Sequence, residues 1–135
     1  MLFRSVSISG DTIYDKNLIN NSKNVDVLFH ESMSVDLVNL LNKNAKRMGN
    51  TMGAKVTIDI QDYHTPIPEI VQAAQEANVG HLVFYHHLPA PRNRLMEDIM
   101  YRGVDQIIEN WTASHDGTMV VLPIDSDEII VTSVD

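Results

Sequence analysis

Side chains that can do chemistry follow three apolar segments of this sequence. Asp11 comes after the first apolar run, Glu31 follows residues 25–29, and His86 follows residues 82–85. The ends of neighbouring strands meet along one rim of a sheet, so we expect these groups to lie close together. An aspartate and imidazoles gathered in this way suit a divalent metal ion and a hydrolytic water. The pattern predicts part of a metal-dependent hydrolytic site.

Each of these signals also has an ordinary structural interpretation. Gly10, Asp11 and Thr12 form a tripeptide that is common in turns, where an aspartate or threonine caps the backbone. His30 can be a buried, hydrogen-bonded side chain at a strand end, and Glu31 can be a solvated loop acid. In the functional interpretation, Glu31 transfers protons with a pKa set by burial and by its neighbours.

His64 precedes Thr65 and Pro66, a hydroxyl residue followed by proline that predicts a helix start. A helix N-terminus disfavours a nearby cation, so we expect this position to lower the pKa of His64. A neutral imidazole that exchanges protons suits ester hydrolysis. A loop histidine bonded to the backbone remains the alternative.

His86 and His87 end the most apolar segment of the chain. Successive strand residues point to opposite faces of a sheet, so only one of the two can enter a given site. We assign no role to His81 or His115.

The remaining pattern alternates short strands with helices. Strands are expected at 3–9, 25–29 and 82–85, and residues 56–60 read as a short strand or an ordered loop. Helices are expected after Ser34 as N-cap up to Gly49, from Thr65 to about 77, and from 93 to about 109. Residues 119–122 pair with 129–134 as a hairpin. This order predicts a single α/β domain over residues 1–135.

Composition narrows the function classes. Apolar residues make up 44% of the 135, enough for a real core, and the net charge is −8. This charge argues against unaided binding of the chain to nucleic acid or to an anionic membrane, since counterion release needs clustered Lys and Arg. With no cysteine, metal ligands are limited to oxygen and imidazole. No apolar run approaches the ~20 residues of a membrane span, and the start is too short and polar for a secretory signal. We expect a cytoplasmic protein with no membrane partner.

Four motifs in order carry a family resemblance: 8–12 (Ile-Ser-Gly-Asp-Thr), 26–31 (Asp-Val-Leu-Phe-His-Glu), 62–66 (Asp-Tyr-His-Thr-Pro) and 82–86 (Leu-Val-Phe-Tyr-His). Together they resemble the C-terminal half of metallo-β-lactamase fold hydrolases, in the ribonuclease Z and arylsulfatase-like branch. The resemblance runs from residue 6 to about 123. It implies one αβ half of an αββα sandwich, with a mixed sheet, helices on one face and a C-terminal hairpin.

The resemblance also implies roles. Asp11 matches the aspartate that bridges two zinc ions, and His86 matches the last histidine ligand of the second zinc. Glu31 and His64 match a glutamate and a histidine that assist proton transfer to the leaving group. Residues 88–92 (Leu-Pro-Ala-Pro-Arg) resemble the proline-rich loop that follows the last histidine.

The sequence departs from the family in one large respect. The family's His-x-His-x-Asp-His motif is absent, no histidine precedes His30, and no His-x-His occurs. Two protein ligands cannot hold a catalytic zinc pair, because even one catalytic zinc usually takes three. We therefore expect this chain alone to be inactive and to bind zinc weakly. A sheet face left bare by the missing half predicts self-association.

Two function classes lead at this point. One is the C-terminal portion of a zinc-dependent hydrolase whose small-molecule substrates carry phosphodiester, sulfate ester or related ester bonds. The other is a non-catalytic α/β self-association module with relic site residues. A receiver-like or flavodoxin-like domain is disfavoured, because the turn at Asp11 lacks paired acids and no lysine ends a later strand.

Overall fold

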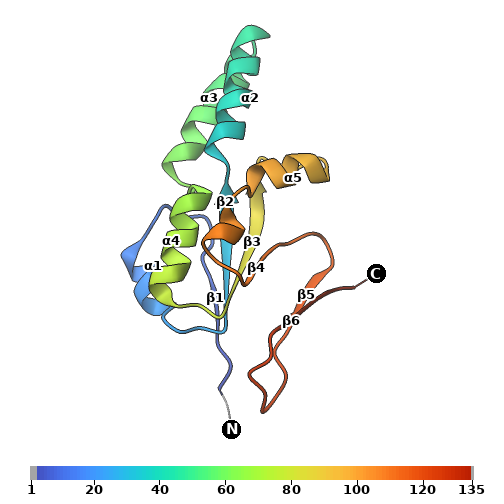
Figure 1. Cartoon of the computed structure of the whole chain (residues 1–135). Helices are drawn as coiled ribbons and strands as arrows, with labels where there is room; N and C mark the ends of the chain where they lie inside the picture. The colour runs from blue at the N-terminus through green and yellow to red at the C-terminus, as the bar shows by residue number, and fades with distance from the viewer. Residues whose placement is uncertain (1–2, 135) are drawn as a thin grey trace.

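A four-stranded parallel sheet forms the centre of the computed structural model, which describes residues 3–134 (Figure 1). Its strands lie in sequence order: β1 (Val6–Ile8), β2 (Val27–Met33), β3 (His81–Leu88) and β4 (Trp111–Ala113). A separate antiparallel pair, β5 (Thr118–Val121) and β6 (Ile130–Ser133), is the expected hairpin. The α/β class is confirmed. The antiparallel pairing lies outside the main sheet, so that sheet is parallel throughout, where a mixed one was expected.

Helices form the crossover connections that parallel strands require. They are α1 (Lys16–Asn21), α2 (Val35–Arg47), α3 (Thr51–Asp59), α4 (Ile67–Ala77) and α5 (Arg94–Met100), with 3-10 turns η1 (Ile60–Asp62) and η2 (Val104–Gln106). Ser34 caps α2 as expected, its hydroxyl accepting from the Leu37 N–H. Asn78, left-handed at φ 52°, ends α4 at the expected place.

Some of these elements differ from what the sequence predicted. Residues 56–60 continue α3 into η1 instead of forming a strand or loop, because Asn50 caps a new helix through the Gly53 N–H. The helix expected from 93 to 109 ends at Met100, and Gly103 at φ 88° begins a 3-10 turn instead. The strand β4 was not anticipated, because three residues are too few to show a period.

One face of the sheet carries the core. Leu28, Leu82 and Phe84 pack there against α4 and against the segment from α5 to η2, and all are at most 2% exposed. Residues paired across parallel strands share a face, so Val6 and Ile8 lie on the other side of the sheet. Both are exposed, which leaves this second face open at its β1 edge. As expected, helices cover the face of the sheet that carries the core.

Candidate functional site

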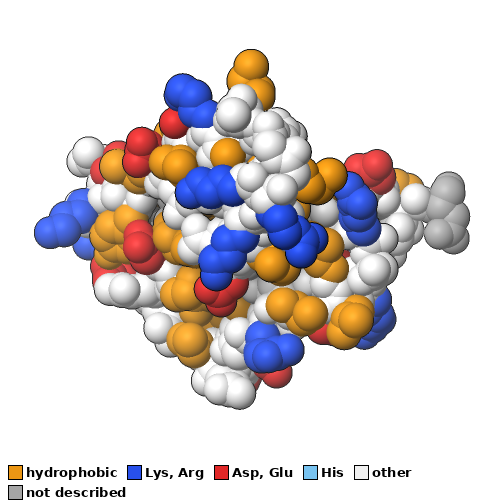
Figure 2. Space-filling view, turned by 90° about the horizontal axis from the view of Figure 1, so that it is seen from above, with side chains coloured by type: hydrophobic (Ala, Val, Ile, Leu, Met, Phe, Trp, Pro, Cys, Tyr) orange, Lys and Arg blue, Asp and Glu red, His pale blue; other side chains and the backbone are white. Residues whose placement is uncertain are grey.

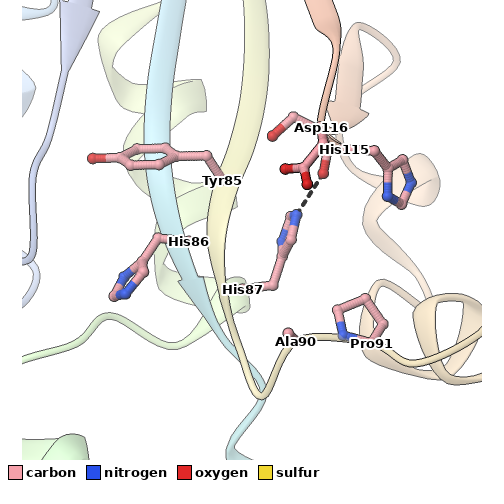
Figure 3. A pocket seen from close by; sticks show the side chains of 8 residues that line it. Tyr85, His86, His87, Ala90, Pro91, His115 and Asp116 are labelled. Carbon is pink, nitrogen blue, oxygen red and sulfur yellow. Dashed lines mark hydrogen bonds between the residues drawn. The ribbon is translucent and has the colours of Figure 1, made fainter.

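A β-bulge sets the direction of His86. The strands β2 and β3 pair residue for residue as far as Glu31 and Tyr85, and the next pair is Ser32 with His87. His86 is therefore the extra residue, and its backbone adopts a left-handed φ of 44°. A bulge re-aims a side chain out of the ladder. Figure 3 shows the consequence: the rings of His86 and His87 point in different directions.

Asp11 meets His86 at the rim of the sheet. Gly10 turns the chain after β1 with φ 63°, a conformation that glycine adopts without strain. The next residue, Asp11, places Oδ1 3.2 Å from Nδ1 of His86, with both side chains about half exposed. The structure thus brings together the two residues that the resemblance assigned to metal binding.

Glu31 and His64 form a buried pair behind this rim. Glu31 lies inside β2, not at its exit as expected, and is fully buried. The backbone N–H of Thr65 donates to its Oε1 over 2.6 Å. Its Oε2 lies 3.3 Å from Nδ1 of His64, and within residues 3–134 neither atom has a well-aligned hydrogen-bond partner. Two facing polar atoms without aligned partners are rare in a folded interior.

Burial shifts the pKa of both groups. Burial, reinforced by the charge of Asp11, raises the pKa of Glu31 to about 7, although the Thr65 N–H and His86 act in the opposite direction. Burial also lowers the pKa of His64, with Asp11 opposing the shift. The direction for His64 agrees with the expectation from sequence. The largest cause of the pKa shift is burial. The helix α4 begins only at Ile67, and Thr65 does not cap it as expected.

Together these side chains form a set of metal-ligating atoms. One atom each of Asp11, His64 and His86 lies within 4.8 Å of the other two. The rings of the two histidines are 5.4 Å apart between centroids. One carboxylate oxygen and two imidazole nitrogens match the ligands that zinc takes in catalytic sites. The donor set therefore fits a zinc ion in its chemistry. Sequence reasoning had considered His64 only for proton transfer.

His87 belongs to a different, fully bonded network. Its Nε2 lies 2.7 Å from the carbonyl oxygen of Ser114, so Nε2 carries the proton and Nδ1 accepts (Figure 3). Near Nδ1 lie the hydroxyl of Tyr101 and the Ser32 hydroxyl, the latter 3.1 Å away. Burial lowers the pKa of His87. Sequence reasoning missed Ser32 and Tyr101, because neither stands in a motif.

A cleft of about 710 Å³ opens beside His86. It is lined by Tyr85, His86, His87, Ala90, Pro91, Ser114, His115 and Asp116 (Figure 3). The proline-rich loop after β3 thus forms one wall, and the turn before the hairpin forms another.

The other histidines stay outside the cluster. His30 is buried and its Nδ1 donates to the Glu31 carbonyl over 2.7 Å. His81 bonds the Thr112 hydroxyl at 2.9 Å. His115 pairs with Glu97, Nε2 to Oε2, at 2.9 Å. These contacts agree with the structural interpretation of His30.

Comparisons with known proteins add to this geometry. No family model matches the sequence. The chain is 29% identical over 121 residues to a ribonuclease Z of Halalkalibacterium halodurans, a match that covers 90% of this chain and 33% of that protein. The structure is similar to the metallo-β-lactamase fold protein YhfI of Bacillus subtilis, with a TM-score of 0.51 and 18% identity over 81% of this chain and 36% of that one.

The chain therefore spans about one third of the length of each of these two proteins. The parallel sheet, the helices on one face and the C-terminal hairpin agree with the structural match. The chain has the metallo-β-lactamase fold, of which it supplies one half.

Proposed function

We propose that this chain is the C-terminal portion of a zinc-dependent hydrolase that cleaves phosphodiester, sulfate ester or related ester bonds. The observation that carries the proposal is the gathering of Asp11, His64 and His86, with the buried Glu31 behind them. The similarity to a protein named ribonuclease Z supports a phosphodiester as one such substrate. In this proposal the family's His-x-His-x-Asp-His motif belongs to the other half of the fold.

In this proposal Asp11 and His86 hold the metal. Bound zinc supplies a water of lowered pKa and stabilises negative charge on the substrate oxygen. Asp11 is well placed to reach an ion, because the turn at Gly10 leaves its carboxylate at the open rim. His86 is held there by the bulge in β3.

Glu31 and His64 handle the proton. A carboxyl group with a pKa near 7 can hold or release a proton at neutral pH, which suits general acid catalysis. The imidazole of His64 lies between Glu31 and the rim, in contact range of both, and burial favours its neutral form. His64 can therefore pass a proton from Glu31 to a leaving oxygen. The bond from Thr65 N–H fixes the orientation of the Glu31 carboxyl.

Zinc titration of the purified chain by calorimetry tests the metal site. With few ligands in this half, we expect weak or substoichiometric binding. Asp11→Ala and His86→Ala should each weaken it by about tenfold or more, because each removes a direct ligand and even the loss of an outer-shell partner has an effect of about this size. The control is His115→Ala, an exposed histidine outside the cluster. Equal zinc binding by all four proteins would rule out this site.

Hydrolysis assays complete the test. Bis-p-nitrophenyl phosphate and an aryl sulfate should show negligible turnover with this chain alone. Robust turnover that Asp11→Ala abolishes would overturn the view that one half is inert, and tight stoichiometric zinc would mean that two copies share ligands across an interface.

The open β1 edge of the second sheet face favours a second candidate, a non-catalytic self-association module. Val6 is 51% and Ile8 66% exposed on β1, the edge strand of the sheet. Pairing two such edges removes apolar area from water. Light scattering at micromolar concentration should then give a dimer that Ile8→Lys dissociates. A monomeric wild type would exclude this function.

A further inference from the structure

Helices α2 and α3 form an arm, residues 35–59, that stands away from the sheet (Figure 1). The 13 residues of α2 span about 20 Å at about 1.5 Å per residue. Asn42 joins the two helices through its side-chain amide, which donates to the Ala54 carbonyl over 2.7 Å and to the Thr57 hydroxyl over 2.8 Å. This buried contact makes the arm a defined projection.

The arm carries the opposite charge to the rest of the molecule. The arm contains four cations, Lys43, Lys46, Arg47 and Lys55, and two acids, Asp36 and Asp59, one near each end, so its net charge is +2. The whole chain is at −8, so the remainder is at −10 (−8 minus +2). All four cations are exposed. In residues 3–134 only Lys55 of these four has an ion-pair partner, Asp59. The view from above shows Lys and Arg side chains gathered near its centre (Figure 2).

Large apolar side chains are exposed beside these cations. Met48 is 79% and Met52 73% exposed at the turn between the helices. Leu40, Leu41 and Val56 are also exposed along the arm. Every residue from 46 to 52 is exposed, so this tip is open to solvent. Cations and flexible apolar side chains thus share one convex tip.

We propose that the tip of this arm binds the surface of an anionic lipid bilayer. The cations suit lipid phosphates, and Met48 and Met52 suit the boundary between headgroups and acyl chains. A nucleic-acid backbone would use the cations but gain nothing from exposed methionines. No helix in the described residues is long and apolar enough to cross a membrane, so the contact is peripheral.

Charge separation orients the bound molecule. An anionic surface attracts the arm and repels the acidic body, so the tip contacts lipid first. The arm begins directly after β2, whose C-terminal part carries Glu31. The candidate site is thereby held about one arm length, or about 20 Å, from the lipid. This interaction goes beyond the proposed hydrolysis and does not depend on it.

Sedimentation with vesicles tests the proposal on the whole chain. We expect binding to vesicles of equal phosphatidylcholine and phosphatidylglycerol, and no binding to phosphatidylcholine alone. The double variant Lys46→Glu/Arg47→Glu should weaken binding by about tenfold or more, since each basic residue near such a surface contributes measurably. Its matched control is Lys16→Glu/Lys23→Glu, the same charge change at exposed positions of the body, which should stay within about twofold of wild type.

A second variant separates the contribution of charge to vesicle binding from the contribution of the apolar side chains. Met48→Ser/Met52→Ser keeps every charge and should weaken binding by about threefold or more. Lys46→Gln/Arg47→Gln covers the case in which charge reversal unfolds α2, and circular dichroism checks all variants. Absence of wild-type binding to the anionic vesicles overturns the proposal. Equal losses in the arm and body variants also overturn it, as does binding to an RNA oligonucleotide without binding to vesicles.

Discussion

Two neighbouring histidines lead into two different polar regions of this fold. His86 turns out of the ladder toward Asp11 and His64, at the rim of the sheet. His87, one residue later, enters the network of Ser32, Tyr101 and the Ser114 carbonyl. Both regions contain imidazoles and hydroxyl or carboxyl groups at hydrogen-bond distances.

The two regions differ in how well their polar groups are satisfied. Around His87, both ring nitrogens have partners, and the Ser32 and Tyr101 hydroxyls lie 2.8 Å apart. Around His86, Glu31 Oε2 and His64 Nδ1 face each other with no aligned partner within the described residues. A satisfied buried network stabilises a fold, whereas an unsatisfied one costs free energy and marks a place where function constrains the residues. The difference indicates a structural role for His87, and it supports the proposal that the rim around His86 carries chemistry.

The largest expected effect concerns the carboxyl group of Glu31, which is buried behind the rim at His86. With a folded pKa near 7 and an unfolded value near 4.5, Glu31 contributes stability that is complete below about pH 4.5 and is lost as pH rises through 7. In Glu31→Gln this loss is absent. The unfolding free energy of the variant minus that of wild type should therefore rise by about 3 kcal/mol from pH 4 to pH 8. Urea denaturation across this range measures it.

The subtraction isolates Glu31 from the histidines. Burial lowers the pKa of His30, His64 and His87, so their contributions are lost as pH falls below about 6.5, the opposite direction. The contributions of His30 and His87 are present in both proteins and largely cancel. That of His64 is coupled to Glu31, because its Nδ1 lies 3.3 Å from the Glu31 Oε2. Glu69→Gln, a change of an exposed acid on α4, is the matched control. A difference for Glu31→Gln that stays constant with pH would remove the contrast between the two regions.

The next effect concerns the satisfied region. His87→Ala removes the acceptor for Tyr101 and the donor to the Ser114 carbonyl, and it opens space beside the Tyr101 ring, whose centroid is 5.8 Å from that of His87. We expect a loss of about 2 kcal/mol in unfolding free energy at pH 7. His115→Ala, which removes an exposed histidine, should cost less than about 0.5 kcal/mol. Equal losses in these two variants would mean that the His87 network does not stabilise the fold.

Regular elements with strong local signals were predictable from the sequence. Ser34 at the start of α2 and the hairpin after Gly117 follow from capping and turn chemistry, and the structure confirms both. The end of α5 at Met100 was not predictable, because apolar spacing continues past the point where Gly103 turns the chain. Residues 56–60 were misread because a run of alternating Val, Ile and Asp resembles a strand until Asn50 is recognised as a cap.

The sequence predicted that Asp11 and His86 lie close together, but not the geometry that brings them together. Residue type and chain order selected Asp11 and His86, and the structure places them 3.2 Å apart. Which of His86 and His87 enters the rim depends on a bulge, and a bulge leaves no mark on hydrophobic periodicity. The buried carboxyl of Glu31 accepts a hydrogen bond from the N–H of Thr65, which is 34 residues away in the chain and adjacent only after folding. Long-range packing, and not local pattern, sets the chemistry of this group.

The smallest expected effect on stability concerns Asp11, at the exposed rim of the sheet. Asp11 and His86 are about half exposed, so solvent screens their attraction and an ion pair of this kind contributes little. Asp11→Asn should change the unfolding free energy by less than about 0.5 kcal/mol in the presence of a chelator. Thermal unfolding with excess zinc then separates the roles, because a ligand that binds only the folded chain raises its stability and the variant should lose this gain. A large loss of stability without metal would instead make Asp11 a structural turn residue, as the sequence alone allowed.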